Sequence, residues 1–208
     1  MAPPPVEAVL FDFGGVLSTS PFDAFERHER ARGLPVGFIR TLNATNAHDN
    51  AWARLERNEV DFDEFCLAFE AEAVAAGGTV DARELFATMA GEMRPEMVEA
   101  VRRCRERLKT GLLTNNFITP TTTARHHDVL DLFDVVIQSA VVGVRKPDPR
   151  FYLMACRELE IEPSAAVFLD DLGVNLKPAR ALGMQTIKVT DPSDALAELE
   201  AVVGFALR

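Results

Sequence analysis

VEAVLFDFGG, residues 6–15, is the stretch that decides the fold class. Its apolar run predicts a strand covered on both faces, because such strands are continuously hydrophobic rather than alternating. Asp12 follows the run, and Gly14 with Gly15 predicts a tight turn after it. Asp is also common at ordinary turns, so Asp12 alone carries no functional conclusion. The stretch predicts a buried strand with a carboxylate at its carboxyl end.

The rest of the chain divides into an all-helical part and a part where strands alternate with helices. The first part has helical patterns at residues 21–32, 36–43, 50–59, 61–76 and 81–91. The second has helical patterns at 96–108, 121–132, 149–159, 175–182 and 194–202, and strand patterns at 111–114, 135–139, 166–169 and 185–189. This alternation predicts an α/β fold with a doubly wound, Rossmann-like parallel sheet. We therefore expect a core of residues 1–17 and 95–208, with residues 18–94 inserted after the first strand as a helical cap over the carboxyl ends of the strands.

Composition and charge argue against several classes of function. The 208 residues carry a net charge of −10, and such an acidic surface repels nucleic acid and anionic membranes. No apolar run reaches the ~20 residues of a membrane helix, and MAPPP at the amino terminus lacks the features of a signal peptide. The three cysteines show neither zinc-ligand spacing nor a disulfide framework, which favours a reducing cytoplasm. The sequence leaves the oligomeric state open, and a homodimer is compatible with it.

Polar residues follow the predicted strands at four places. Asp12 is the first. Thr114 and Asn115 form the second, where a hydroxyl group and backbone amides at the start of a loop suit an anion. Lys146 lies in the third, the segment RKPDP at 145–149, as a compact positive charge for a phosphate. Turn chemistry and an exposed lysine are the alternative interpretations of these residues when each is taken alone.

Asp170 and Asp171 form the fourth cluster. Adjacent acids at one strand end repel each other, and they are tolerated where a cation sits between them. A helix amino terminus, which also favours acids, is the alternative interpretation. Because the carboxyl ends of parallel strands share one edge of the sheet, the four clusters would converge. Together they supply a nucleophilic carboxylate, donors to a phosphate and ligands for Mg²⁺, which is the set that phosphoryl transfer needs.

At these residues the chain resembles the haloacid dehalogenase-like hydrolase superfamily. The resemblance covers nearly the whole chain and comprises four motifs in order: FDFGGVL at 11–17, LTN at 113–115, KP at 146–147 and FLDD at 168–171. Residues 167–183 are similar to the N-terminal phosphatase domain of soluble epoxide hydrolase, and to related N-terminal domains of some acyl-CoA dehydrogenase family members. The helical block before residue 95 resembles the cap of that group.

The resemblance implies a role for each matching residue. Asp12 would be the nucleophile that forms an aspartyl-phosphate, and Asp12 and Asp171 would ligate Mg²⁺ directly. Asp170 would act on the metal through water, and Asn175 would orient the acid pair or a metal-bound water. Thr114 and Asn115 would bind the transferring phosphate, and Lys146 would neutralise it.

Gly14 departs from the family pattern, which usually has a second Asp two residues after the nucleophile. The backbone carbonyl of Gly14 can still ligate the metal, but glycine has no side chain to protonate the leaving oxygen or activate water. General acid–base catalysis raises a rate by about 10²–10⁴-fold, so its loss should slow the hydrolysis of esters with poor leaving groups most.

Three functions therefore remain. The first is a Mg²⁺-dependent phosphatase that acts on a small phosphate ester, slowly or with another acid in place of residue 14. The second is a dehalogenase, which attacks through an Asp without a metal; the pair Asp170–Asp171 argues against it. The third is a binding or regulatory domain without activity, which Gly14 favours because a fold alone does not fix an activity.

Overall fold

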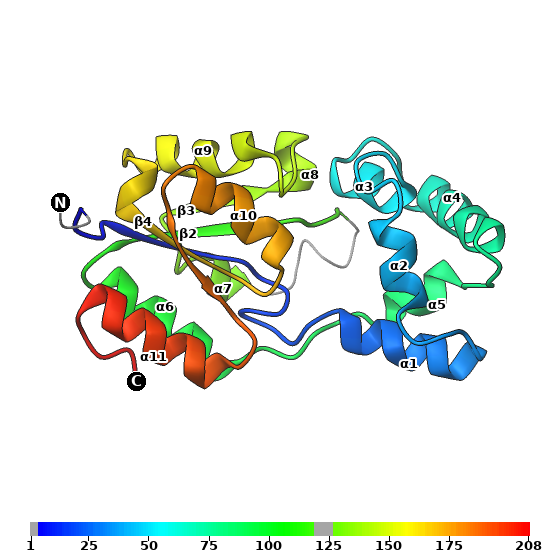
Figure 1. The fold of residues 1–208 in the computed structure, drawn as a ribbon, viewed down its shortest axis with the longest axis horizontal. Coiled ribbons are helices and arrows are strands. Elements are labelled where there is room, and N and C mark those ends of the chain that lie inside the picture. The colour runs from blue at the N-terminus through cyan, green and yellow to red at the C-terminus, as the bar shows by residue number, and fades with distance from the viewer. Residues whose placement is uncertain (1–3, 119–126) are drawn as a thin grey trace.

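The computed structural model describes residues 4–118 and 127–208, which form a parallel sheet with helices on both faces and a group of helices at one end (Figure 1). The sheet has five strands in the order β3-β2-β1-β4-β5, and all its pairings are parallel. The strands are β1 (Ala8–Phe11), β2 (Lys109–Thr114), β3 (Val135–Gln138), β4 (Ala166–Asp170) and β5 (Gln185–Lys188). The predicted α/β, doubly wound fold is confirmed.

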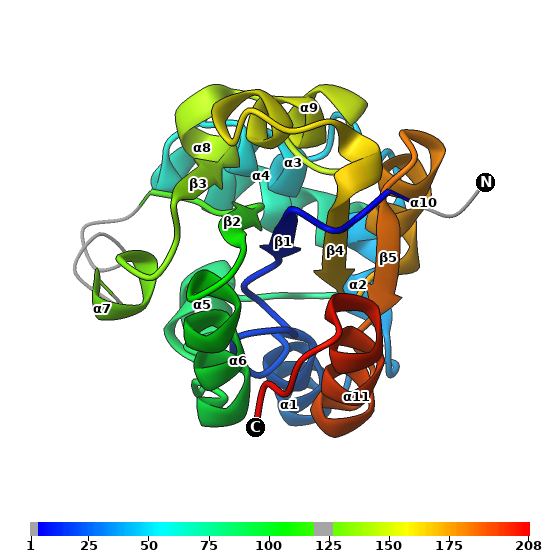
Figure 2. The same ribbon diagram turned by 90° about the vertical axis from the view of Figure 1, so that its left-hand side faces the viewer.

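Two helical layers enclose the sheet, and Figure 2 shows it between them. One layer contains α6 (Pro95–Arg105), α7 (His127–Leu130) and α11 (Pro192–Val203), and the other contains α8 (Ser139–Val142), α9 (Pro149–Glu158) and α10 (Gly173–Ala181). Within β1, Val9 and Phe11 face the first layer, whereas Ala8 and Leu10 face the second. All four are fully buried, which explains why this strand is continuously apolar.

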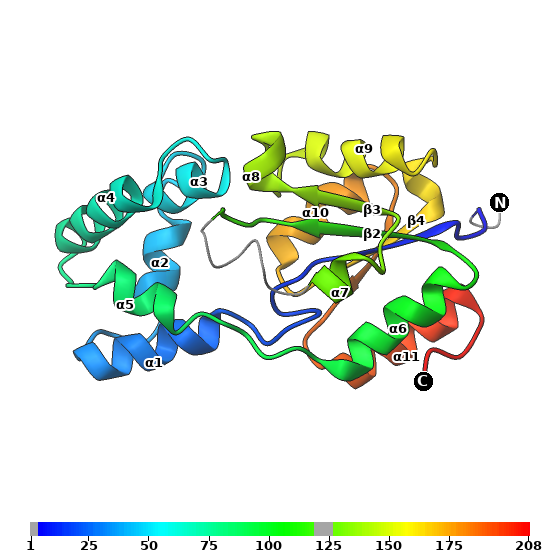
Figure 3. The same cartoon turned by 180° about the vertical axis from the view of Figure 1, so that it is seen from behind.

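Five short helices between β1 and α6 pack on one another beyond the carboxyl ends of the strands (Figure 3). They are α1 (Phe22–Arg32), α2 (Phe38–Ala44), α3 (Ala51–Glu56), α4 (Phe62–Ala75) and α5 (Ala82–Ala87). Trp52 lies at the centre of their core, in ring contact with Phe25, Phe65, Phe69 and Phe86. Aromatic burial of this kind gives the helical group a hydrophobic core of its own.

Carboxylates from neighbouring helices bind the amino ends of two of these helices. Glu29 of α1 accepts hydrogen bonds from the backbone N–H groups of Gly37 and Ile39 at the start of α2. Glu72 of α4 accepts one from Ala51 at the start of α3. The first N–H groups of a helix have no partner within it, so these acids stabilise helices too short to persist alone. Buried Glu29 is therefore explained without a catalytic role.

The two segments that connect the helical group to the sheet run side by side. Ser18 and Met93 form an antiparallel bridge, and the N–H of Arg94 donates to the Leu17 carbonyl over 2.8 Å. The connections therefore leave the sheet together, immediately after the loop that follows Asp12.

The structure differs from the predicted elements in detail. The strand predicted at 135–139 ends at Gln138, because Ser139–Val142 forms the single-turn helix α8. Of the helix predicted at 121–132, His127–Leu130 is helical, and residues 119–126 lie outside the described residues. Across residues 4–118 and 127–208, no helix combines the length and the apolar character that crossing a membrane requires.

Candidate active site

Three carboxylates meet where the neighbouring strands β1 and β4 end. The register pairs Phe11 with Leu169, and the N–H of Asp12 donates to the Leu169 carbonyl over 2.9 Å. Asp12 and Asp170 therefore lie side by side, with Asp171 next along the chain. One ligand oxygen from each of these three carboxylates lies within 4.8 Å of the other two. The predicted convergence of the first and fourth clusters is present.

Lys146 is buried between two of these carboxylates. Its Nζ lies 2.8 Å from Asp12 Oδ1 and 2.7 Å from Asp170 Oδ2, and the side chain is 1% exposed. The Asn115 side chain fixes the backbone at this point, since its Oδ1 accepts from the Lys146 N–H and its Nδ2 donates to the Lys146 carbonyl. The third cluster therefore joins the first and fourth through charge, and Asn115 of the second positions it.

Asp170 is held by several donors and is fully buried. Its Oδ1 accepts from the Leu172 N–H over 2.8 Å, and Asn175 Nδ2 lies 3.1 and 3.0 Å from its two oxygens. Tyr152 donates its hydroxyl to the Asn175 carbonyl, which holds Asn175 in turn. These bonds engage the lone pairs of Asp170, so this residue orients Lys146 more readily than it ligates a metal. The predicted contact of Asn175 with the acid pair is present.

Burial and mutual repulsion shift the protonation of the cluster. Burial is the main cause that raises the pKa of Asp12 well above its ordinary range, and Asp170 and Asp171 add to it against the opposing charge of Lys146. Burial with repulsion from Asp170 raises the pKa of Asp171 to about 6. For Lys146, burial alone would lower the pKa, but Asp12 and Asp170 outweigh it and raise the pKa. Three acids share one buried ammonium group, so the site has excess negative charge.

That donor set fits a hard divalent cation. Carboxylate oxygens are the ligands that Mg²⁺ prefers, and a cation beside Asp12 and Asp171 would relieve the repulsion that raises their pKa values. Asp171 is partly exposed and lies against Gly15, where a side chain would occupy the position of its carboxylate. The residues present therefore suit Mg²⁺.

The two glycines after Asp12 have different structural requirements. Gly15 has a φ of +80°, and a Cβ atom there would overlap the Asp171 carboxylate. At Gly14 a Cβ would meet only Pro21 Cδ, at the ordinary contact distance of 3.5 Å. Arg94 holds this loop from the other side, because its Nη1 donates to the Gly15 carbonyl over 2.6 Å. The loop therefore requires glycine at position 15 and leaves room for a side chain at position 14.

Gly15→Ala is expected to destabilise the protein by roughly 1–3 kcal/mol, because it adds backbone strain and displaces Asp171. Gly14→Ala is the matched control, and its stability should stay close to wild type. Thermal unfolding with EDTA and with Mg²⁺ measures both effects, and the stabilisation by Mg²⁺ should shrink only in Gly15→Ala. Equal behaviour of the two variants would contradict this account of the loop.

The remaining predicted residue, Thr114, ends β2 at the same edge of the sheet, two residues beyond the pair Phe11–Leu112. Sequence reasoning did not find Arg94, Tyr152 or the Asn115–Lys146 contact. Each of these contacts joins residues at least 23 positions apart through one or two hydrogen bonds, so no local sequence pattern predicts it.

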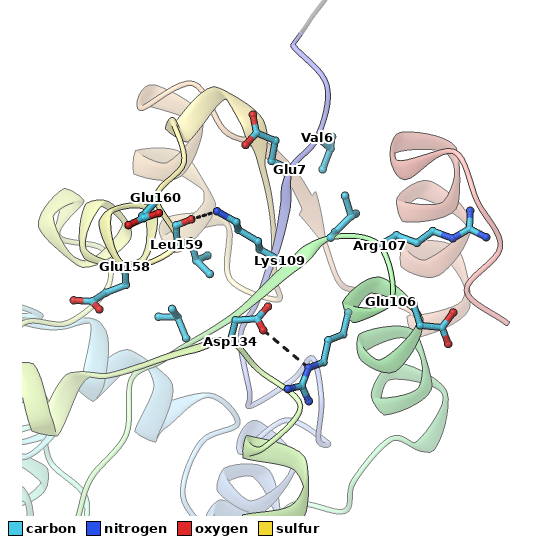
Figure 4. Close-up of a pocket in the computed structure, with 12 residues that line it drawn as sticks. Val6, Glu7, Glu106, Arg107, Lys109, Asp134, Glu158, Leu159 and Glu160 are labelled. Atoms are coloured by element: carbon cyan, nitrogen blue, oxygen red, sulfur yellow. Dashed lines mark hydrogen bonds and ion pairs between the residues drawn. The ribbon is translucent and has the colours of Figure 1, made fainter.

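A hollow of about 700 Å³ lies at the opposite, amino-terminal edge of the sheet (Figure 4). Charged side chains of both signs line it, and several already have partners. Lys109 donates to the Leu159 carbonyl, and Arg105 lies 4.0 Å from Asp134. This hollow is remote from the carboxylate cluster and has no arrangement that suits a reaction.

Comparisons with known proteins identify the family of this chain. A family model described as haloacid dehalogenase-like hydrolase matches residues 6–183. The chain belongs to this hydrolase family. The resemblance identified from the four motifs is thereby confirmed.

The similar proteins include some that are much longer than this chain and one of similar length. It is 36% identical to mouse acyl-CoA dehydrogenase family member 10 and 32% identical to pig bifunctional epoxide hydrolase 2. These matches cover 96% and 97% of this chain, which spans only 19% and 40% of those longer proteins. A phosphatase of Mycobacterium tuberculosis is 31% identical, with 88% of this chain and 87% of the relative covered. The last match shows that this hydrolase unit also occurs at nearly the full length of a relative.

Solved structures confirm the fold without deciding the reaction. An enzyme of the family from Bacteroides thetaiotaomicron, in complex with magnesium and inorganic phosphate, has a TM-score of 0.62 at 20% identity and covers 88% of this chain and 93% of that one. An L-2-haloacid dehalogenase from Xanthobacter autotrophicus has the same TM-score at 21% identity, with 94% and 82% covered. Because an enzyme that binds magnesium and phosphate and a dehalogenase share this fold, the reaction must be argued from the site.

Proposed function

We propose that this chain is a Mg²⁺-dependent phosphatase-type hydrolase that acts on a small phosphorylated metabolite through an aspartyl-phosphate at Asp12. One observation carries the proposal: Asp12 is one of three clustered carboxylates, and the buried Lys146, which contacts Asp12 and Asp170, supplies only one positive charge against them. A dehalogenase works without a metal and would keep this excess negative charge uncompensated. The Mycobacterium phosphatase and the magnesium–phosphate complex of the Bacteroides enzyme support the same conclusion.

The proposal assigns each residue a role. Asp12 and Asp171 would hold Mg²⁺ together with the Gly14 carbonyl, and Asp170 would act behind them. A bound Mg²⁺ would supply the positive charge that lets an anionic carboxylate approach an anionic phosphate. Asp12 Oδ2 is the atom left to attack phosphorus, because Oδ1 accepts from Lys146 and from the Phe13 N–H.

Phosphate recognition would come from the neighbouring strand ends. We assign the phosphate oxygens to the Thr114 hydroxyl and to Asn115, whose side chain also holds the Lys146 backbone. Lys146 would neutralise charge on the phosphate and would favour the ionised form of Asp12 against the effect of burial. Residues 1–17 and 95–208 would form the catalytic core and residues 18–94 the cap that selects the substrate. A cytoplasmic location remains an expectation from composition.

A substrate panel tests the proposal. Purified protein with Mg²⁺ should hydrolyse at least one of a broad set of phosphate esters, and EDTA should abolish that hydrolysis. Failure across the whole set would leave the non-catalytic binding domain as the better interpretation. Release of halide from 2-haloacids that survives EDTA would select a dehalogenase instead.

Gly14→Asp is expected to raise activity on sugar and alkyl phosphates more than on p-nitrophenyl phosphate. The added carboxyl group would protonate the leaving oxygen, and general acids of this kind contribute about 10²–10⁴-fold. Aryl leaving groups need little protonation, so p-nitrophenyl phosphate serves as the internal control. Space for the side chain exists, because only Pro21 lies near a Cβ at this position. An unchanged ratio of the two activities would mean that residue 14 does not limit the acid step.

A further inference from the structure

Arg145, next to Lys146 in the sequence, contacts the helical group instead of the carboxylate cluster. Its Nε lies 2.7 Å from Oε2 of Glu56, the last residue of α3, and its Nη1 donates to the Ala47 carbonyl over 3.0 Å. Figure 1 shows α3 beside α8, the point at which the two parts meet. The side chains of the adjacent residues Arg145 and Lys146 therefore contact different parts of the molecule: Lys146 contacts Asp12, and Arg145 contacts α3.

Glu56 has no part in the proposed chemistry, yet it is buried, with 7% of its surface exposed. Its Oε1 accepts from the indole N–H of Trp52 over 3.0 Å, which connects it to the aromatic core of the helical group. Burial raises the pKa of Glu56 despite the opposing charge of Arg145. Such a carboxylate is tolerated in this position because Arg145 neutralises it.

The ion pair is close but poorly directed. Although Arg145 Nε and Glu56 Oε2 approach to 2.7 Å, neither atom makes a hydrogen bond of normal geometry to any group in the described part of the chain. A hollow of about 410 Å³ lies beside Arg145, lined from the helical group by Ala47, His48 and Arg57 and from the core by residues 143–145 and 147–150. The junction at this point is therefore a charged contact beside a hollow.

The proposed reaction needs a path by which a phosphate ester reaches Asp12. Asp12 is only 8% exposed, and the helical group lies beyond the strand ends at which a phosphate ester must enter. Asn115 holds the Lys146 backbone at both its N–H and its carbonyl. We expect a shift of the Lys146 side chain on binding phosphate to be transmitted to the neighbouring residues of this segment. Arg145 belongs to that same segment.

We propose that Arg145 and Glu56 are positioning residues that couple the helical group to the Lys146 segment, so that binding at the phosphate site changes the position of α3. The inference rests on the proposed function only in taking Lys146 as a phosphate contact. Trp52, the single tryptophan of the chain, reports on the coupling because it is hydrogen-bonded to Glu56.

The test measures Trp52 fluorescence and calorimetric binding during titration with inorganic phosphate in Mg²⁺. Wild type should show a saturable fluorescence change with the dissociation constant that calorimetry gives. Arg145→Met should bind phosphate within about threefold of wild type, since Arg145 does not touch the carboxylate cluster, but should lose most of the fluorescence change. Glu59→Gln, which removes a neighbouring exposed carboxylate that pairs with Arg57, is the matched control and should respond like wild type. Absence of a response in wild type, or its persistence in Arg145→Met, would overturn the proposal.

Kinetics separate coupling from a merely structural role. Glu56→Gln keeps an acceptor for Trp52 but leaves the partly exposed Arg145 without its counter-charge, so kcat/KM should fall about tenfold or more through a smaller closed population. Arg145→Lys should retain more activity than Arg145→Met. The double variant Glu56→Gln/Arg145→Met contains no unpaired charge and should regain thermal stability without regaining kcat/KM. Recovery of both would show that the pair is only structural and would refute the coupling.

The coupling can be tested separately from the proposed function. If neither wild type nor any variant hydrolyses a phosphate ester, but the Trp52 response still depends on Arg145, the proposed function fails and the coupling stands.

Discussion

Asp12→Asn is expected to lower kcat for phosphate-ester hydrolysis by about 10⁴-fold or more, because an amide does not attack phosphorus and losses of this size follow removal of a nucleophile. Lys146 keeps its contact with Asp170 in this variant, so the site remains assembled. Steady-state kinetics on the best substrate of the panel measure the loss.

In Asp12→Asn the thermal stability should stay equal or rise while the activity falls. The raised pKa of Asp12 means that the fold disfavours its charged form at neutral pH. Asparagine removes that charge at nearly constant size, so the Tm in EDTA should equal or exceed that of wild type. Asp23→Asn changes an exposed carboxylate of α1 and should leave both quantities unchanged. Residual activity above about 1% of wild type in Asp12→Asn would contradict the assigned role.

Lys146→Met is expected to abolish hydrolysis and also to destabilise the protein by about 3–5 kcal/mol at neutral pH, since it leaves buried carboxylates without their counter-charge. Methionine is close to lysine in volume, so the lost charge dominates the effect. Lys177→Met, on the exposed face of α10, is the matched control and should be close to neutral.

The pH dependence of Lys146→Met follows from Asp12. Loss of the ammonium group removes an influence that lowers the pKa of Asp12, so this pKa rises further. Between the unfolded pKa, roughly 3.9, and the raised folded value, the folded state binds more protons than the unfolded state. Stability of the variant should therefore increase as the pH falls from 8 to 5. Denaturant unfolding at a series of pH values measures this, and a deficit that stays constant with pH would contradict the charge account.

Much of the fold was predictable because burial imposes simple patterns. The run before Asp12 is apolar on both faces since β1 lies in the middle of the sheet, between β2 and β4. Helix α8 was not predictable, because SAVV directly after β3 has the same apolar character as the end of a strand. The single turn forms where the chain must leave the sheet, and tertiary packing selects it.

The candidate site was predictable at the level of strand ends. Asp12 and Asp170 meet because parallel neighbours end together, and this needs only the strand order. The orientation of each side chain was not predictable. The contact of the Asn115 side chain with the Lys146 backbone was not predicted, and Arg145 was not singled out although it is adjacent to Lys146. Such contacts depend on positions that only the folded chain brings together.

The most direct test of the central claim is to quench the enzyme with acid during turnover and to locate phosphorus by mass spectrometry of the peptides. The account predicts a phosphoryl group on the peptide that contains Asp12. It should accumulate in wild type, because Gly14 provides no base to activate the water that releases it, and should decrease in Gly14→Asp. Hydrolysis that proceeds with phosphorus on another residue, or on none, would contradict the claim that Asp12 is the nucleophile.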